Sequence, residues 1–176
     1  MIKGGKGGAK TQSGLVFESK VKLEDTIRAL KGYEVRNGIV LRGGSEVARL
    51  FYKRGLYKNL LEPRGVDYSK LISKRLEPDS ALLVGNTLYI IEIKFQEVGG
   101  SVDEKIQTCD FKRRQYEKLC QPLGLKVVYA YVLSEFFSSP GYEDVRNYIR
   151  AVGCHYFFKT IPLDFLGLDE GPIEAS

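Results

Sequence analysis

The stretch EPDSALLVGNTLYIIEIK, residues 77–94, contains the most informative pattern of the sequence. Gly85 and Asn86 separate two runs of β-forming residues, which predicts a β-hairpin with a two-residue turn. Counting outward from the turn, Val84 faces Thr87, and the same count brings Asp79 opposite Glu92. Directly opposed residues of an antiparallel pair point to the same face, with Cβ atoms about 4.5–5.5 Å apart. The hairpin therefore predicts that two carboxylates meet.

Lys94 extends this pattern, because side chains alternate along a strand and Lys94 shares a face with Glu92. Like charges at the edge of an apolar core are costly unless a positive group neutralises them. Magnesium would do so, since it takes oxygen ligands and is often held by one or two carboxylates. A lysine beside it can orient or deprotonate a water and balance negative charge. The alternative is a Pro-Asp turn followed by an ion pair on a solvated edge.

Bulk composition limits the other possibilities. A chain of 176 residues suits one hydrophobic core, and its 43% hydrophobic and 28% charged content is that of a globular protein. Lysine and arginine total 27 against 22 acidic residues, a formal charge of +5. This excess favours a polyanionic partner without requiring one.

The cysteines favour a reduced environment. Cys109, Cys120 and Cys154 are odd in number and lack a C-x-x-C spacing, which argues against a disulfide framework and a zinc site. The first residues are basic but no apolar core follows them, so no signal peptide is expected. The apolar runs are too short to span a bilayer. We therefore expect a soluble, cytoplasmic protein without membrane contact.

The N-terminal residues differ in composition from the rest. Residues 3–10, KGGKGGAK, predict a flexible basic arm over 1–12, followed by a single domain over 13–176. Lys6 and Lys10 are candidates for contacts with phosphates. The alternative is a plain disordered tail.

The remaining pattern predicts an α/β protein. We expect a helix from Ser13, its N-cap, to Gly32, with Val16, Lys20, Leu23, Ile27 and Leu30 on one stripe. The other expected elements are a hairpin with an Asn-Gly turn over 33–42, a short helix near 45–53, a helix over 103–119, a strand over 123–133, a helix over 142–152 and a last strand over 155–161. The polar stretch up to residue 76, rich in arginine, lysine and tyrosine, otherwise gives no assignment. Together they predict a mixed central β-sheet flanked by helices.

Pro78-Asp79, then twelve residues, then Glu92-Ile93-Lys94 resembles the signature of the PD-(D/E)xK nuclease superfamily. The order of elements over residues 13–133 is similar to it as well. The resemblance implies a restriction-endonuclease-like core, in which Asp79, Glu92 and the carbonyl of Ile93 bind Mg²⁺, with Mn²⁺ able to substitute. It also implies that Lys94 serves the water nucleophile, that Glu18 of the leading helix adds a further acid, and that the substrate is a DNA phosphodiester.

Within that superfamily, the compact chain looks like a type II restriction endonuclease acting on double-stranded DNA. Gln96, Ser101 and Lys105, in and beside the glycine loop after the 87–94 strand, would then lie on the DNA side. Arg113 and Arg114 could hold phosphates, although basic runs are usually solvated faces. Two-fold symmetric DNA would call for a homodimer.

Other functions stay open at this stage. A structure-selective repair nuclease, a Holliday-junction resolvase or a homing endonuclease could use the same scaffold, and a DNA-binding module could have lost turnover. Cys154 and His155 are adjacent but would point to opposite faces of a strand, which disfavours a thiol nucleophile activated by histidine.

Overall fold

The computed structural model describes residues 14–17, 22–97 and 102–168. The predicted basic arm over 1–12 lies outside these residues, as does the stretch 18–21 inside the predicted N-terminal helix. Among the described residues, every helix is too short or too polar to traverse a bilayer.

A mixed β-sheet forms the centre of the described part of the chain. Its strand order is β2-β3-β4-β5-β6-β7-β8. Strands β2 to β6 are antiparallel neighbours, whereas β7 is parallel to β6 and β8 is parallel to β7. The strands are β2 (Tyr33–Arg36), β3 (Ile39–Arg42), β4 (Ser45–Phe51), β5 (Ser80–Val84), β6 (Thr87–Lys94), β7 (Lys126–Leu133) and β8 (His155–Phe158). The predicted α/β class with a mixed sheet is confirmed.

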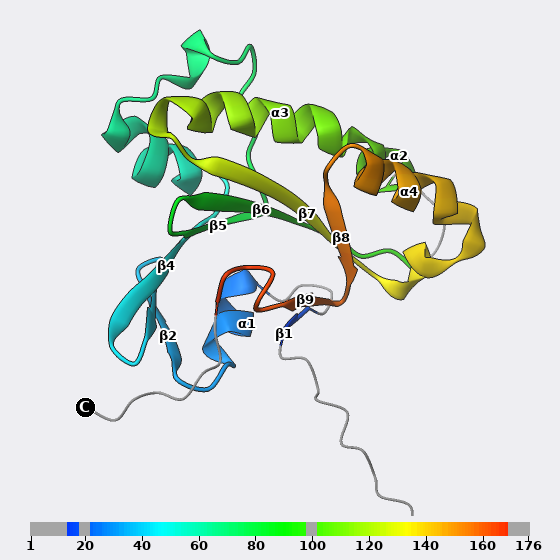
Figure 1. Cartoon of the computed structure of the whole chain (residues 1–176), viewed down its shortest axis with the longest axis horizontal. Coiled ribbons are helices and arrows are strands. Elements are labelled where there is room, and N and C mark those ends of the chain that lie inside the picture. Colours follow the sequence, from blue (N-terminus) through cyan, green and yellow to red (C-terminus); the bar gives the residue numbers. More distant parts are fainter. Residues whose placement is uncertain (1–13, 18–21, 98–101, 169–176) are drawn as a thin grey trace, which may run out of the picture.

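Helices and short helical turns cover both faces of this sheet (Figure 1). On one face lie α3 (Cys109–Cys120), α4 (Glu143–Ala151) and the turns η1 (Tyr57–Leu61), η2 (Glu62–Arg64) and η3 (Tyr68–Lys70). On the other lie α1 (Leu23–Arg28) and a small sheet of β1 (Gly14–Val16) and β9 (Thr160–Pro162). Each face has its own buried cluster. The remaining elements are α2 (Val102–Lys105), η4 (Ile106–Thr108), η5 (Gln121–Leu123), η6 (Glu135–Ser138) and η7 (Pro140–Tyr142).

Both predicted hairpins are confirmed. Val84 pairs with Thr87 and Ser80 with Ile91, which is the register expected from the Gly85-Asn86 turn. At the other hairpin, Arg36 pairs with Ile39 across Asn37 and Gly38, whose φ angles are 50° and 78°. Positive φ at both central residues is the requirement of a type I′ turn, which Asn-Gly meets.

The predicted helices after the central hairpin are also confirmed, with small changes at their ends. The helix expected over 103–119 is α2, η4 and α3 in succession, and its predicted inner residues Ile106, Cys109, Tyr116 and Leu119 are all buried. The helix expected over 142–152 is α4. The strand expected over 123–133 is β7, which begins at Lys126.

The helix predicted from Ser13 to Gly32 is wrong in its first half. Residues 14–16 form β1, which pairs with β9, and α1 begins only at Leu23. Leu15 and Phe17 are buried while Val16 between them is 57% exposed, which is the two-residue period of a strand. Leu23 and Ile27 do pack inward as the stripe predicted.

The short helix predicted near 45–53 is also wrong, because residues 45–51 form β4. Ala48 and Leu50 are buried on one face and Phe51 on the other. Strand β4 is held between β3 and β5, so pairing on both sides decides its conformation. Sheet propensity of this kind depends on neighbours that a local pattern does not contain.

The last predicted strand, 155–161, is divided in two. Lys159 adopts a φ of 56°, which ends β8 and turns the chain into β9. The amide of Lys159 donates to the carbonyl of Leu133, and its own carbonyl accepts from the amide of Phe17. The break therefore transfers the chain from the central sheet to the small sheet with β1.

We expect Gly38→Ala to lower the free energy of unfolding more than Gly44→Ala. Both glycines have φ near 80°, so both substitutions carry the left-handed strain of about 1–3 kcal/mol. Only at Gly38 would the new Cβ lie 2.8 Å from a backbone atom, the carbonyl oxygen of Leu50. Urea denaturation of the two variants measures the difference. Equal losses would contradict the close approach of the Asn37-Gly38 turn to β4.

Candidate active site

The candidate site lies at one end of the central strands, where β4 ends, β5 begins and β6 ends. Asp79 immediately precedes β5. Glu92 and Lys94 lie at the C-terminal end of β6. Leu88 and Ile90 on the same face of β6 are fully buried beneath α3. The face predicted to be apolar near the turn and charged at its end is therefore observed.

One ammonium group joins the two carboxylates. Lys94 Nζ lies 3.0 Å from Glu92 Oε2 and 3.4 Å from Asp79 Oδ2. Glu92 is only 4% exposed, so its charge is largely removed from water. A buried carboxylate is tolerated when it is paired and hydrogen-bonded. The structure thus brings Asp79, Glu92 and Lys94 together on one side of the sheet.

Two further lysines reach these carboxylates, and neither was predicted from the sequence. Lys53 Nζ lies 2.6 Å from Asp79 Oδ1, and Lys112 Nζ lies 3.9 Å from Glu92 Oε2. Lys53 follows β4, a strand that was predicted as helix. Lys112 lies three residues after Cys109 and four before Tyr116, so helical spacing from these two predicted inner residues could have identified it.

The backbone beside Asp79 has an unusual arrangement that Pro78 explains. The amide of Ile93 donates to Asp79 Oδ2 over 3.3 Å, so the amide and carbonyl of Ile93 face the β5 side. Continuing the register places Pro78 opposite Ile93, and proline has no N–H to donate. The carbonyl of Pro78 accepts instead from the amide of Lys53. The ladder therefore stops here, and the Ile93 carbonyl is directed to the side of the Asp79 carboxylate.

The charges of the site stabilise one another. Burial raises the pKa of Asp79, but the hydrogen bond from Lys53 and the charges of Lys94 and Lys53 outweigh it, so the pKa is lowered. Burial lowers the pKa of Lys94, but the attraction of Glu92 and Asp79 outweighs it, so the pKa is raised. Lys94 is therefore a charged hydrogen-bond donor at neutral pH and balances the carboxylates.

The donor set fits a hard cation with few protein ligands. Asp79, Glu92 and the Ile93 carbonyl offer oxygen atoms from two adjacent strands, and magnesium completes its six positions with water and phosphate oxygens. Within the described residues, no group of three or more histidine, cysteine, aspartate or glutamate side chains lies together as a metal site.

The other predicted site residues are not shown to contact Asp79, Glu92 or Lys94. Lys6, Lys10, Glu18 and Ser101 lie outside the described residues. Gln96 joins the ends of β6 and β7, since its amide and carbonyl both bond to the hydroxyl of Ser134. Lys105 is exposed at the end of α2.

Arg113 and Arg114 are engaged within their own helix. Arg113 pairs with Asp110 and Glu117 and is 19% exposed, while Arg114 pairs with Asp110. Both guanidinium groups therefore stabilise α3, as expected of charges at helical spacing. Lys112, between Phe111 and Arg113, is the basic residue of this run that turns toward the site.

Cys154 and His155 point to opposite faces, as predicted. Cys154 is buried with the cluster beneath α3 and α4, whereas the His155 ring packs on Phe165, 5.0 Å between centroids, on the other side. This pair cannot work as a nucleophile and its base.

No model of a protein family, no curated protein and no solved structure matches this chain.

We expect Lys94→Met to reduce the free energy of unfolding by about 3 kcal/mol, because it leaves the buried Glu92 carboxylate with only the longer, 3.9 Å contact to Lys112. Lys53→Met should cost less than about 1 kcal/mol, since the Lys53 side chain is 55% exposed and its pair is a surface ion pair. Chemical denaturation in metal-free buffer measures both. A larger loss for Lys53→Met would show that the buried charge is not the centre of this network.

Proposed function

We propose that this chain is a magnesium-dependent endonuclease that hydrolyses DNA phosphodiester bonds. The single observation that carries the proposal is the convergence of Asp79 and Glu92 on one Lys94 ammonium. Two carboxylates held together by the register of a hairpin provide the oxygen ligands that magnesium prefers. The resemblance to the PD-(D/E)xK signature supports the same conclusion from the sequence.

The roles of the residues follow from their positions. Asp79, Glu92 and the Ile93 carbonyl would hold magnesium, which supplies activation of a water and polarisation of the phosphate. Lys94, charged and 18% exposed, would stabilise negative charge that develops on the phosphate. Lys112 reaches Glu92 from α3 and would help to orient this carboxylate. Lys53 holds Asp79 from the other side.

The form of nuclease that we propose is a type II restriction endonuclease, acting as a homodimer on double-stranded DNA with a core like that of such enzymes. A homodimer would present one such site to each strand. Discrete fragments from a plasmid would support this assignment. Cleavage of four-way or flapped DNA without sequence preference would favour a repair nuclease or resolvase instead.

The proposal is tested by incubating plasmid DNA with the protein and Mg²⁺. We expect cleavage by the wild type and a loss of about 100-fold or more in rate for Asp79→Asn, Glu92→Gln and Lys94→Ala. Calcium in place of magnesium should support binding with little turnover.

Asp144→Asn is the matched control, because it neutralises an exposed acid in the first turn of α4, which the structure does not connect to the site. It should cleave like the wild type. Unchanged cleavage by all three site variants would exclude the proposed active site, and binding without any cleavage by the wild type would favour the DNA-binding module.

A further inference from the structure

The positive charge of the chain is concentrated in one segment. Residues 53–75, between β4 and β5, contain seven lysine and arginine residues against two acidic ones, a net charge of +5. The formal charge of the whole chain is also +5, so all other residues together are neutral. Such an asymmetry produces a local field that attracts a polyanion.

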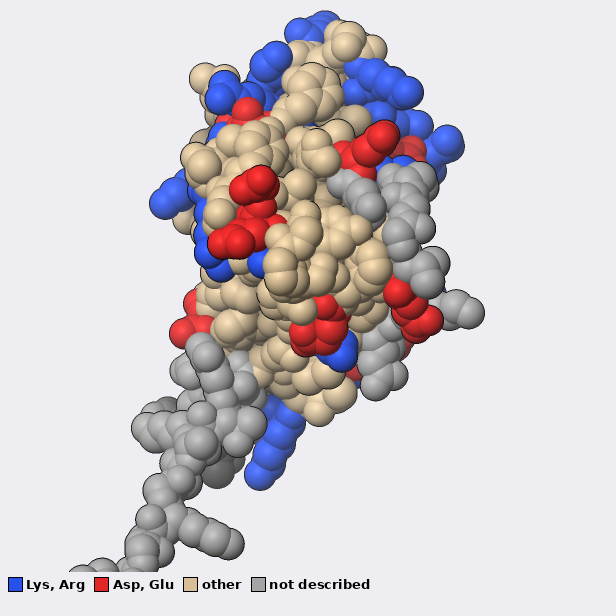
Figure 2. Space-filling view, turned by 90° about the vertical axis from the view of Figure 1, so that its right-hand side faces the viewer, with Lys and Arg blue, Asp and Glu red and all other residues tan. Residues whose placement is uncertain are grey.

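The opposite side of the molecule shows a different distribution. Figure 2 looks at the face that lies at the right of Figure 1, where acidic side chains are scattered over the middle and basic ones gather mainly at the top. The 53–75 segment lies at the other side, at the upper left of Figure 1, beside the C-terminal half of α3. The excess of basic residues in this segment therefore lies at that end of the molecule.

The segment is attached directly to the candidate active site. Lys53 at its start pairs with Asp79. Arg54 and Arg75, near its two ends, both pair with Glu77, at 3.0 and 3.4 Å. Glu77 is two residues before Asp79, so these pairs fix the approach to the site from both ends of the segment.

Packing holds the segment in one conformation. Its apolar residues Leu56, Tyr57, Leu60, Leu61, Val66 and Ile72 are buried in the cluster that also contains Tyr116 and Leu119 of α3. Arg75 lies over the rings of both Tyr57 and Tyr68, 5.6 Å from each centroid. A surface ordered in advance binds without the entropy cost of ordering flexible side chains and loops.

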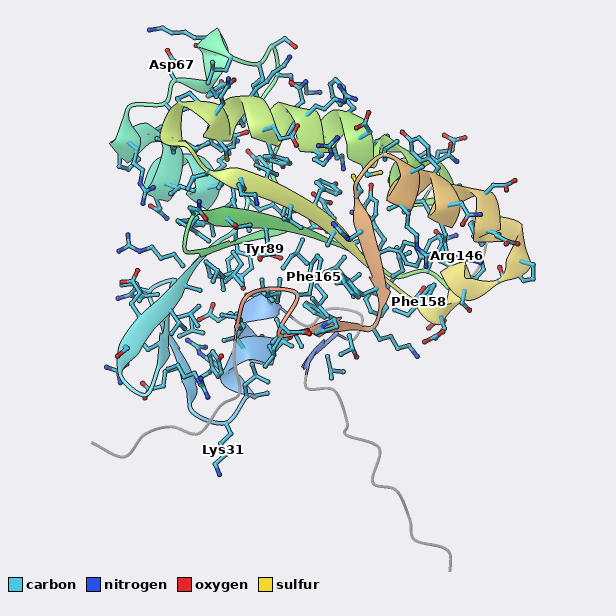
Figure 3. The ribbon with its side chains drawn as sticks, viewed as in Figure 1. Lys31, Asp67, Tyr89, Arg146, Phe158 and Phe165 are labelled. Atoms are coloured by element: carbon cyan, nitrogen blue, oxygen red, sulfur yellow. The ribbon has the colours of Figure 1, made fainter. Side chains whose placement is uncertain are left out.

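The outer side of the segment is basic and exposed. Lys58, Arg64 and Lys74 are exposed, and the side chain of Lys70 is 80% exposed, with only a 3.9 Å contact to Asp67. Figure 3 labels Asp67 at the top of the molecule and Lys31 at the bottom. These cations are thus accessible to a ligand, and Lys70 is the one that contacts Asp67.

The aromatic residues of the segment favour a duplex over a single strand. Single-stranded nucleic acid is bound by exposed aromatic rings on which bases stack. Tyr57 is 1% exposed and its hydroxyl donates to the carbonyl of Leu76, and Tyr68 packs edge-on against Tyr57. The segment therefore offers cations without stacking platforms, which suits contacts to phosphates of a double helix.

We infer that the 53–75 segment is the surface that holds the backbone of duplex DNA beside the candidate active site. This inference rests on the proposed function, and it assigns DNA contacts to residues other than Gln96, Lys105, Arg113 and Arg114. The segment supplies affinity that is independent of sequence, and Lys53 couples this surface to Asp79.

The test compares two triple variants with the same change in charge. Lys58→Ala, Arg64→Ala and Lys74→Ala remove exposed cations from the segment, while Lys22→Ala, Lys31→Ala and Lys126→Ala remove three exposed cations elsewhere. Binding to a 20-base-pair duplex of arbitrary sequence is measured by fluorescence anisotropy in Ca²⁺ over a range of salt concentrations. A single strand of the same length is the second probe.

We expect the segment variant to bind the duplex about tenfold or more weakly at low salt and to lose about three from the slope of log K against log salt, because each phosphate contact contributes about 0.9. The control variant should stay close to the wild type. Equal losses in the two variants, no binding of the duplex by the wild type, or tighter binding of the single strand would overturn the inference.

Failure of this inference can be distinguished from failure of the proposed catalytic function. Cleavage of plasmid DNA in Mg²⁺ is measured for Asp79→Asn and duplex binding is measured for the segment variant, so loss of cleavage and loss of binding are read separately. If Asp79→Asn still cleaves while the segment variant fails to bind, the active site is wrong and the binding surface stands. If Asp79→Asn loses cleavage while the segment variant binds the duplex like the wild type, the proposed active site is supported and the inferred binding surface is wrong.

Discussion

The burial of the Glu92 carboxylate is the constraint on which the arrangement of the site depends. A charge that is 4% exposed at the edge of an apolar core must be compensated by groups from other elements. Lys94 does this from the same strand, and Lys112 does it from α3. Asp79 shares Lys94 and is in turn held by Lys53 after β4. A single buried acid therefore links three strand ends and a helix into one electrostatic unit.

The geometry of this unit was predictable where it depends on local sequence. The Gly85-Asn86 turn fixes the register, and the alternation of side chains then determines the face of Glu92 and Lys94. The Asn37-Gly38 turn fixes the register of the β2–β3 hairpin in the same way. In both hairpins the turn residues and the short runs beside them carry the information that determines the register.

The incorrect predictions concern segments whose conformation is determined by partners distant in the sequence. Strand β4 lies between two other strands, and β1 exists because β9, nearly 150 residues later, returns beside it. Neither partner is visible in a local pattern of apolar residues. Lys53 was missed for the same reason, since its place in the site depends on the end of β4. Lys112 was missed because a run of basic residues does not by itself show which member turns inward.

The 53–75 segment connects two neighbouring strands of the sheet, and its buried and exposed residues are under different constraints. Phe51 and Ala81 are paired neighbours, so the chain leaves the sheet and returns to it at adjacent points. Leu56, Leu60 and Ile72 of this segment are buried in the core, while Lys58, Arg64 and Lys74 are exposed. The exposed lysine and arginine residues can consequently be replaced by uncharged or acidic residues at little cost in stability. Surface substitutions of this kind usually change the free energy of unfolding by less than about 0.5 kcal/mol. If the segment holds duplex DNA as inferred, mutations at these exposed positions would change the affinity for DNA during evolution. The carboxylates of the site and their lysines would stay unaltered.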